Sequence, residues 1–150
     1  MKRRLWIGGT VAVAVVAAAF VTVTVLHHSP AATPPKADSN GVPTEDVSWV
    51  KDQIARGALV LDVRKDDEWA AGRVPQSMHI PLAQVQDRTA ELPKGRTIIT
   101  VCKDGGRSYK AAYALRQAGF NAVNLAGGLT AWTAAGLPVL DDTGAAGRIL

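Results

Sequence analysis

The clearest indication of the fold is the segment Thr97-Ile98-Ile99-Thr100-Val101-Cys102-Lys103-Asp104-Gly105-Gly106-Arg107-Ser108. Residues 97–101 are all β-branched, which is typical of a short strand that is covered on both faces. Residues 108–118 are predicted to form a helix, because small alanines allow it to approach a sheet closely and Gly119 follows at its end. A strand, a glycine-containing loop and a helix in this order predict one unit of an α/β fold.

The same alternation of strands and helices continues on both sides of this unit. Together these segments predict an α/β domain over residues 44–140, with a largely parallel sheet flanked by helices. The further predicted elements are strands at 59–63, 78–80 and 122–125, a helix capped by Thr44 and stopped by Gly57, and helical segments at 82–88 and 129–135.

The N-terminal residues have the pattern of a transmembrane segment or a signal peptide. The uncharged, apolar residues 5–26 follow Lys2-Arg3-Arg4, and as a helix they would span about 33 Å, close to the roughly 30 Å of a bilayer core. The positive-inside rule then predicts a cytoplasmic stub at 1–4, a transmembrane signal-anchor at 5–26 and a domain outside the cytoplasm. A signal peptide cleaved near Ala19 is the alternative, and it also exports the domain.

Two segments are predicted to lie outside the folded domain. Residues 27–43 are rich in Pro and Ala and are expected to form an extended linker. Residues 141–150 are expected to form a flexible tail.

Charge and cysteine content exclude several classes of protein. The net charge is +4, but three of the 17 basic residues lie at positions 2–4, so the rest of the chain has 14 basic and 13 acidic residues. This near balance does not favour binding to nucleic acid. Cys102 is the chain's one cysteine, which excludes an internal disulfide and a zinc site built on paired thiols. No metal and no organic cofactor are expected.

The cysteine loop, residues 102–108, is the candidate active site. Ligands of an open α/β sheet bind beyond the carboxyl ends of its strands, where this loop must lie. Gly105 and Gly106 allow successive N–H groups to face one concavity, and the following helix directs its positive end there. Lys103 and Arg107 add positive charge while Asp104 opposes it, so negative charge on the Cys102 sulfur would be stabilised. A buried, inert cysteine is the alternative interpretation.

Asp62 and Arg64 follow one another closely at the end of a predicted strand. Such a pair is typical of a structural ion pair or a loop anchor near the site, and a catalytic role is not expected for it.

Five motifs follow one another along the predicted domain: Leu61-Asp62-Val63-Arg64, Glu68-Trp69-Ala70-Ala71-Gly72-Arg73-Val74-Pro75, His79-Ile80-Pro81, Cys102-Lys103-Asp104-Gly105-Gly106-Arg107-Ser108 and Leu125-Ala126-Gly127-Gly128-Leu129-Thr130-Ala131-Trp132. In this order and spacing they resemble the single-domain rhodanese, or thiosulfate sulfurtransferase-like, family. The resemblance covers residues 44–140, although Arg73 stands where the family often has His and Gln76-Ser77 replace its usual Gly-Ala. It implies that Cys102 accepts sulfane sulfur as a persulfide, and that backbone amides of the loop cradle this sulfur.

The leading hypothesis is therefore a membrane-tethered, extracytoplasmic sulfurtransferase. It would move sulfur from a small donor such as thiosulfate to a thiol or another thiophilic acceptor through Cys102. The first alternative is a non-catalytic rhodanese-like module that binds partners or carries sulfur. A phosphatase or arsenate reductase is a further alternative, which the Cys-x4-Arg spacing disfavours because cysteine phosphatases use Cys-x5-Arg.

Overall fold

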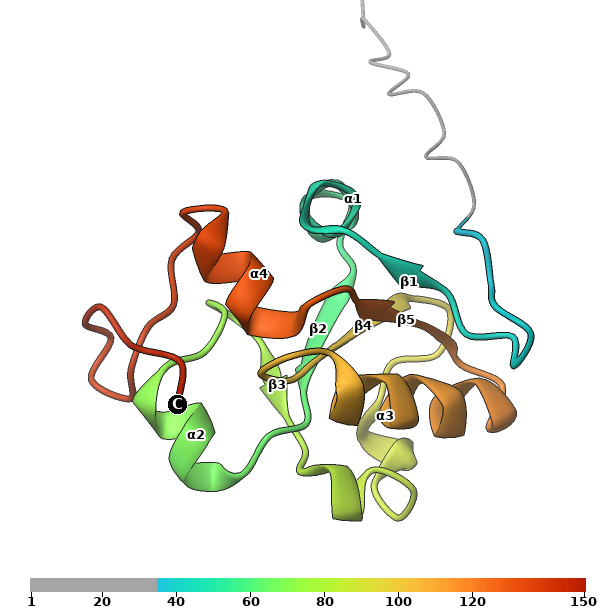
Figure 1. Ribbon diagram of the computed structural model, residues 1–150. Coiled ribbons are helices and arrows are strands. Elements are labelled where there is room, and N and C mark those ends of the chain that lie inside the picture. The colour runs from blue at the N-terminus through green and yellow to red at the C-terminus, as the bar shows by residue number, and fades with distance from the viewer. Residues whose placement is uncertain (1–34) are drawn as a thin grey trace, which may run out of the picture. The chain divides into compact units, whose positions relative to one another are not determined.

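The computed structural model describes residues 35–150, in which strands and helices alternate (Figure 1). Between β3 and β4 the chain forms two short 3-10 turns, at Leu82–Gln84 and Thr89–Glu91, in place of the helical segment predicted at 82–88. The elements are β1 (Thr44–Glu45), α1 (Val47–Ala55), β2 (Leu59–Asp62), α2 (Asp66–Ala71), β3 (Met78–His79), β4 (Thr97–Val101), α3 (Gly106–Gln117), β5 (Asn121–Leu125) and α4 (Gly128–Ala134).

The strands of residues 35–150 form one sheet in the order β1-β5-β4-β2-β3, and every pair is parallel. Helix α3 covers one face, whereas α1 and α4 cover the other (Figure 1). Neighbouring residues of β4 therefore enter different cores: Ile98 packs on the α3 side, and Ile99 packs with Val50 and Trp132 on the other side. The predicted parallel sheet flanked by helices is confirmed.

The predicted helix cap at Thr44 is wrong. Thr44 lies in β1 and pairs with Asn124 of β5, and α1 begins three residues later at Val47. The cap is Asp46, whose carboxylate accepts a hydrogen bond from the Trp49 N–H at 2.9 Å. Asp and Thr are both good caps, so pairing with the edge of the sheet decided between them.

The end of the predicted linker packs on the domain. Asp38 accepts hydrogen bonds from the backbone N–H groups of Asn40 and Val42 and from the Tyr109 hydroxyl of α3. Val42 is buried in the core on the α3 side. Ordered contacts thus begin before residue 44, because the Asp38 turn brings an apolar side chain to the sheet.

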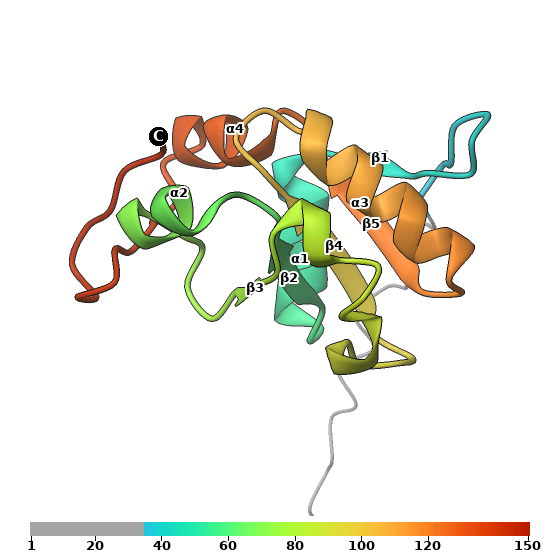
Figure 2. The same ribbon diagram turned by 90° about the horizontal axis from the view of Figure 1, so that it is seen from below.

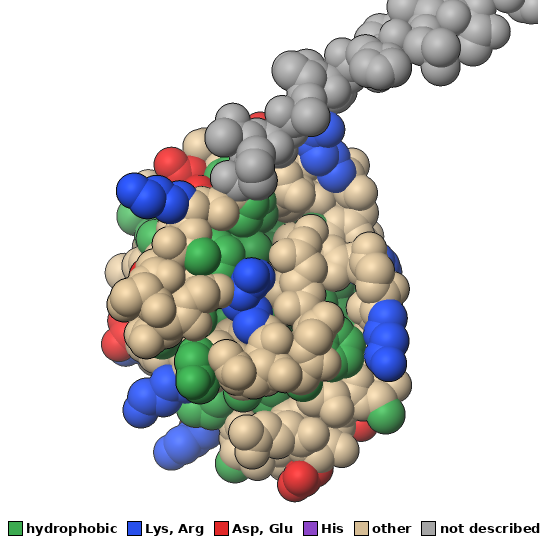
Figure 3. All heavy atoms as spheres, turned by 90° about the vertical axis from the view of Figure 1, so that its right-hand side faces the viewer, with side chains coloured by type: hydrophobic (Ala, Val, Ile, Leu, Met, Phe, Trp, Pro, Cys, Tyr) green, Lys and Arg blue, Asp and Glu red, His purple; other side chains and the backbone are tan. Residues whose placement is uncertain are grey.

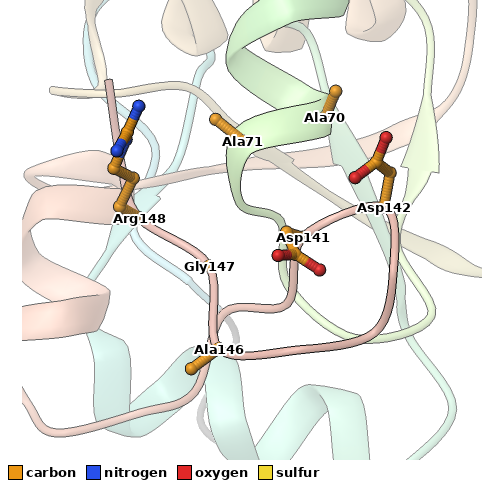
Figure 4. Close-up of a pocket in the computed structure, with 7 residues that line it drawn as sticks. All are labelled: Ala70, Ala71, Asp141, Asp142, Ala146, Gly147 and Arg148. Atoms are coloured by element: carbon orange, nitrogen blue, oxygen red, sulfur yellow. The ribbon is translucent and has the colours of Figure 1, made fainter.

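The last residues, which were expected to form a flexible tail, are hydrogen-bonded to α2 in the structure. The N–H groups of Asp142 and Arg148 donate hydrogen bonds to the carbonyls of Ala70 and Ala71, respectively. These carbonyls lie at the end of α2, where they have no partner within the helix. The two backbones touch at Gly72, where a Cβ would lie 2.4 Å from the Arg148 carbonyl oxygen. Figure 4 shows the pocket of about 400 Å³ between these segments, lined by Ala70, Ala71, Asp141, Asp142, Ala146, Gly147 and Arg148.

Across residues 35–150, no helix combines the length and the apolar character that crossing a membrane requires. The predicted stub at 1–4 and the predicted transmembrane segment at 5–26 lie outside the described residues.

On the side of the domain shown in Figure 3, Lys and Arg side chains stand apart from one another and form no continuous basic patch.

Candidate active site

Cys102 directly follows β4, and α3 begins four residues later at Gly106. Because all strands are parallel, this loop lies at the carboxyl edge of the sheet, next to the start of α4 (Figure 2). The Cys102 side chain is fully buried. The loop thus lies beyond the carboxyl ends of the strands, as predicted.

Hydrogen-bond donors surround the Cys102 sulfur. The backbone N–H groups of Gly105 and Ser108 point at Sγ at 3.2 and 3.4 Å, and the Ser108 hydroxyl lies at 3.3 Å. Gly105 reaches this position with a φ of +97°, a left-handed conformation that favours glycine. Converging donors stabilise negative charge on sulfur, which is the property a thiolate nucleophile requires.

The Asp104 side chain, which belongs to the same loop, contacts both the loop backbone and the Cys102 sulfur. Its Oδ1 accepts a hydrogen bond from the Gly106 N–H at 3.0 Å and lies 3.5 Å from Sγ, where it can accept the thiol proton. The hydrogen bond from Gly106, followed by that from Cys102, holds the pKa of the Asp104 carboxyl below its usual value.

The loop amides were predicted to surround the sulfur. The Gly105 and Ser108 amides reach it, while the Gly106 amide binds the Asp104 carboxylate. Lys103 is exposed.

Two carbonyl groups of the loop bind the start of α4. Cys102 O accepts from the Leu129 N–H at 2.8 Å, and Lys103 O accepts from the N–H and the hydroxyl of Thr130, both at 2.9 Å. Gly127 and Gly128 form a tight turn before α4, with φ values of +68° and +57°. The sequence pattern did not predict that this turn presses on the cysteine loop.

A buried polar side chain below the loop was also missed. Asn124 of β5 is 4% exposed, and its Oδ1 lies 2.7 Å from the Ser108 hydroxyl oxygen. An amide within the otherwise apolar run of residues 122–125 was the signal available in the sequence, because buried polar groups need partners.

Arg107 forms an ion pair with Glu68 of α2. Its two terminal nitrogens each lie 2.7 Å from a Glu68 oxygen. Hydrogen bonding from Arg107 lowers the pKa of Glu68 to about 2, and the same contact raises the pKa of Arg107. The predicted contribution of Arg107 to a positive loop is therefore offset by a carboxylate on a neighbouring helix.

Replacement of Glu68 by Gln should make the folded protein less sensitive to acid. A carboxyl with a pKa near 2 in the folded state, against 4.5 as its ordinary value, stabilises the fold above about pH 4.5 and loses this contribution as the pH falls toward 2. We expect Glu68→Gln to cost about 1 kcal/mol at pH 7, since Arg107 is 35% exposed and water screens the pair. Urea unfolding at pH 7, 4 and 2.5 measures this difference, which should shrink with falling pH.

The exposed Arg88–Glu91 pair provides the control, since Glu91→Gln should have a smaller effect at every pH. A Glu68→Gln difference that stays constant from pH 7 to 2.5 would contradict the assignment.

Asp62 and Arg64 form the expected ion pair. Both side chains are fully buried, with Nη2 of Arg64 2.6 Å from Oδ2 of Asp62. The same Arg64 nitrogen donates to the Gly72 carbonyl at 2.5 Å. The pair thereby ties the end of β2 to the end of α2 and positions Glu68 indirectly.

Arg73, which departs from the residue that is frequent in the resembled family, packs on α2. The Cζ atom of Arg73 lies 4.0 Å from the ring centroid of Trp69. Trp69 also stacks on the His79 ring, with the two centroids 4.9 Å apart. Arg73 thus serves as a packing residue in a cation–π contact.

A pocket of about 320 Å³ adjoins the loop at Arg107. Val63, Pro81, Leu82 and Ala83 provide its apolar wall. These residues follow β2 and β3, so the pocket lies outside the carboxyl ends of the strands, where a ligand is expected.

The fold and the site define a class of parallel α/β domains that hold a cysteine in an amide-lined loop at the carboxyl edge of the sheet. The family model for the rhodanese-like domain matches residues 46–135, and the chain belongs to this family.

Two curated relatives and a solved structure support the assignment. The chain is 38% identical over 87 residues to "Sulfurtransferase" of Allochromatium vinosum, covering 57% of this chain and 81% of the relative. It is 37% identical over 75 residues to "Putative sulfur carrier protein YrkF" of Bacillus subtilis, covering 49% and 40%. A rhodanese-related protein from Thermoplasma volcanium superposes with a TM-score of 0.61 at 29% identity, covering 65% of this chain and 96% of that one. These relatives support a role in sulfur transfer or sulfur carriage.

Proposed function

We propose that this protein is a sulfurtransferase that carries sulfane sulfur on Cys102. The Cys102 thiolate attacks the outer sulfur of a donor such as thiosulfate, the sulfur–sulfur bond of the donor breaks, and sulfite leaves with the electron pair. A thiolate acceptor then attacks the outer sulfur of the persulfide, and Cys102 leaves as a thiolate. The observation that carries the proposal is the convergence of the Gly105 and Ser108 backbone N–H groups on Sγ.

The contacts of Arg107 argue against phosphoryl or arsenate chemistry. An arginine that binds a tetrahedral oxyanion must present two N–H groups to its oxygens. In this structure both terminal nitrogens of Arg107 bind Glu68. Sulfur transfer does not need these donors, because a single sulfur atom is transferred.

In the test, one preparation of the full-length protein in detergent is incubated separately with thiosulfate and with aryl phosphates. After thiosulfate, intact mass should show the gain of one sulfur atom and sulfite should appear in solution, whereas aryl phosphates should not be hydrolysed. Phosphatase activity that depends on Cys102, without sulfur loading, would overturn the proposal.

Sulfur carriage without turnover is the second candidate, and the complete burial of Cys102 favours it. A sulfur carrier would load sulfur but release it only to a protein partner. Steady turnover with a small thiol as acceptor would exclude this candidate.

Replacement of Asp104 by Asn should accelerate loading from an anionic donor. The amide keeps an oxygen for the Gly106 N–H but removes a negative charge next to Sγ. We expect the second-order rate of loading by thiosulfate to rise about 3- to 10-fold at low ionic strength, and the gain to shrink in high salt. An equal gain with an uncharged organic polysulfide would contradict this electrostatic explanation.

We further propose that residues 5–26 anchor the domain on the extracytoplasmic side of the cell membrane, or that a signal peptide ending near Ala19 exports it. Support comes from the basic residues at 2–4 followed by an uncharged apolar segment. Protease added to cells with a permeabilised outer layer should digest the domain. Digestion only after lysis of the cytoplasmic membrane would show the opposite orientation.

A further inference from the structure

Three buried side chains form a polar chain beneath the cysteine loop. Cys102 and Ser108 are fully buried and Asn124 is 4% exposed. The Ser108 hydroxyl oxygen lies 3.3 Å from the Cys102 sulfur and 2.7 Å from Asn124 Oδ1. Beyond it, Asn124 Nδ2 lies 3.4 Å from the Thr44 hydroxyl oxygen of β1.

The Ser108 hydroxyl has one proton but three acceptors within reach. Besides the sulfur and Asn124 Oδ1, the Gly105 carbonyl oxygen lies at 3.1 Å. The shortest of these contacts is the one to Asn124, so in this arrangement the proton points away from the sulfur. A thiolate or a persulfide anion at Cys102 requires the opposite orientation, with the hydroxyl donating to sulfur.

We propose that Asn124 is a positioning residue that directs the Ser108 hydroxyl toward the Cys102 sulfur when this sulfur carries negative charge. This inference rests on the proposed function of Cys102 and extends it to the residue behind the loop.

An amide is suited to this role because it can reverse its hydrogen bond. A half-turn of the Asn124 amide presents Nδ2 to the Ser108 oxygen and Oδ1 to Thr44, whose hydroxyl can then donate. The Ser108 hydroxyl would receive a hydrogen bond from the amide while donating its own proton to sulfur, and linked bonds of this kind strengthen one another. No covalent bond changes in this step.

The pH dependence of Cys102 alkylation tests the proposal. Cys102 is the chain's one cysteine, so the rate of iodoacetamide incorporation into the full-length protein reports on this sulfur alone. The charged groups that interact with the sulfur are Asp104 and Arg107, and both stay unchanged in the variants. The variants are Asn124→Ala, Asn124→Asp, Ser108→Ala and the double variant Asn124→Ala/Ser108→Ala.

Loss of the oriented hydroxyl should move the alkylation midpoint upward. We expect a shift of about 1 pH unit for Ser108→Ala and about half of this for Asn124→Ala, on the scale of hydrogen-bond effects on ionisation. Asn124→Asp should shift the midpoint by more than about 1 unit, because a carboxylate can only accept and also adds negative charge. The double variant should match Ser108→Ala, since Asn124 acts through the hydroxyl.

Asn121→Asp is the matched control, because it makes the same change at an exposed position of the same strand. It should leave the midpoint within about 0.2 units. The proposal is overturned if Asn124→Ala shifts the midpoint equally in the wild-type and Ser108→Ala backgrounds, or if it causes no shift at all. These comparisons do not depend on whether Asn124→Asp folds.

The alkylation experiment uses no sulfur donor, which separates the two proposals. Failure of the wild-type protein to load sulfur would refute the proposed function alone. Additive effects of the Asn124 and Ser108 variants in a protein that loads sulfur would refute the positioning role alone.

Discussion

Replacement of Cys102 by Ser is expected to abolish sulfur loading while the fold is retained. Cys102 is the chain's one cysteine, and the donors of Gly105 and Ser108 converge on its sulfur. A serine hydroxyl is similar in size and can accept the same hydrogen bonds, but it is a far poorer nucleophile toward sulfane sulfur. We expect the rate of loading to fall more than about a thousandfold.

Intact mass after thiosulfate and steady turnover with a thiol acceptor measure this loss. Urea unfolding supplies the folding control, and the Cys102→Ser midpoint should stay close to that of the wild-type protein. A folded Cys102→Ser protein with near-normal turnover would exclude the proposed mechanism.

Replacement of Gly128 by Ala should damage both stability and the site. A Cβ at this position would lie 2.4 Å from Cys102 O and 2.7 Å from the Gly105 backbone nitrogen, so the cysteine loop would have to move. The φ of +57° adds a left-handed cost for any side chain. We expect a loss of about 3 kcal/mol or more in unfolding free energy, together with a large loss of sulfur loading.

Gly136→Ala separates these two contributions. Gly136 has a similar φ of +73°, but a Cβ there would meet nothing within 4 Å. This control should lose only about 1 to 2 kcal/mol and should load sulfur normally. Equal losses of stability and loading in the two variants would show that contact of Gly128 with the loop has no special role.

The cysteine loop was predictable because the signals that define it are local. A β-branched run, a glycine pair and an alanine-rich helix lie next to one another in the chain, and each acts through its own backbone preferences. The carboxyl-edge position of Cys102 then follows from the geometry of parallel sheets. The Asp62–Arg64 pair was predictable for the same reason, because its members are two residues apart.

The partners of these residues depend on contacts between distant parts of the chain. Glu68 and Arg107 are 39 residues apart, and Asn124 reaches Ser108 only because β5 lies beside β4. The N-cap of α1 is Asp46 and not Thr44, because Thr44 belongs to β1, which pairs with β5 at the edge of the sheet. The last residues contact α2 because two of their N–H groups meet carbonyls at the end of that helix.

Residue types in consecutive positions therefore specify the α/β class, the glycine-containing loop and the place of its cysteine at the end of a strand. How the loop is held depends on contacts made in the folded chain: Arg107 pairs with Glu68, two loop carbonyls accept hydrogen bonds from α4, and the Ser108 hydroxyl is hydrogen-bonded to Asn124. The physical reason is that a buried charge or hydrogen-bond donor is satisfied by whichever group the fold brings within reach, and residue spacing along the chain does not specify that group.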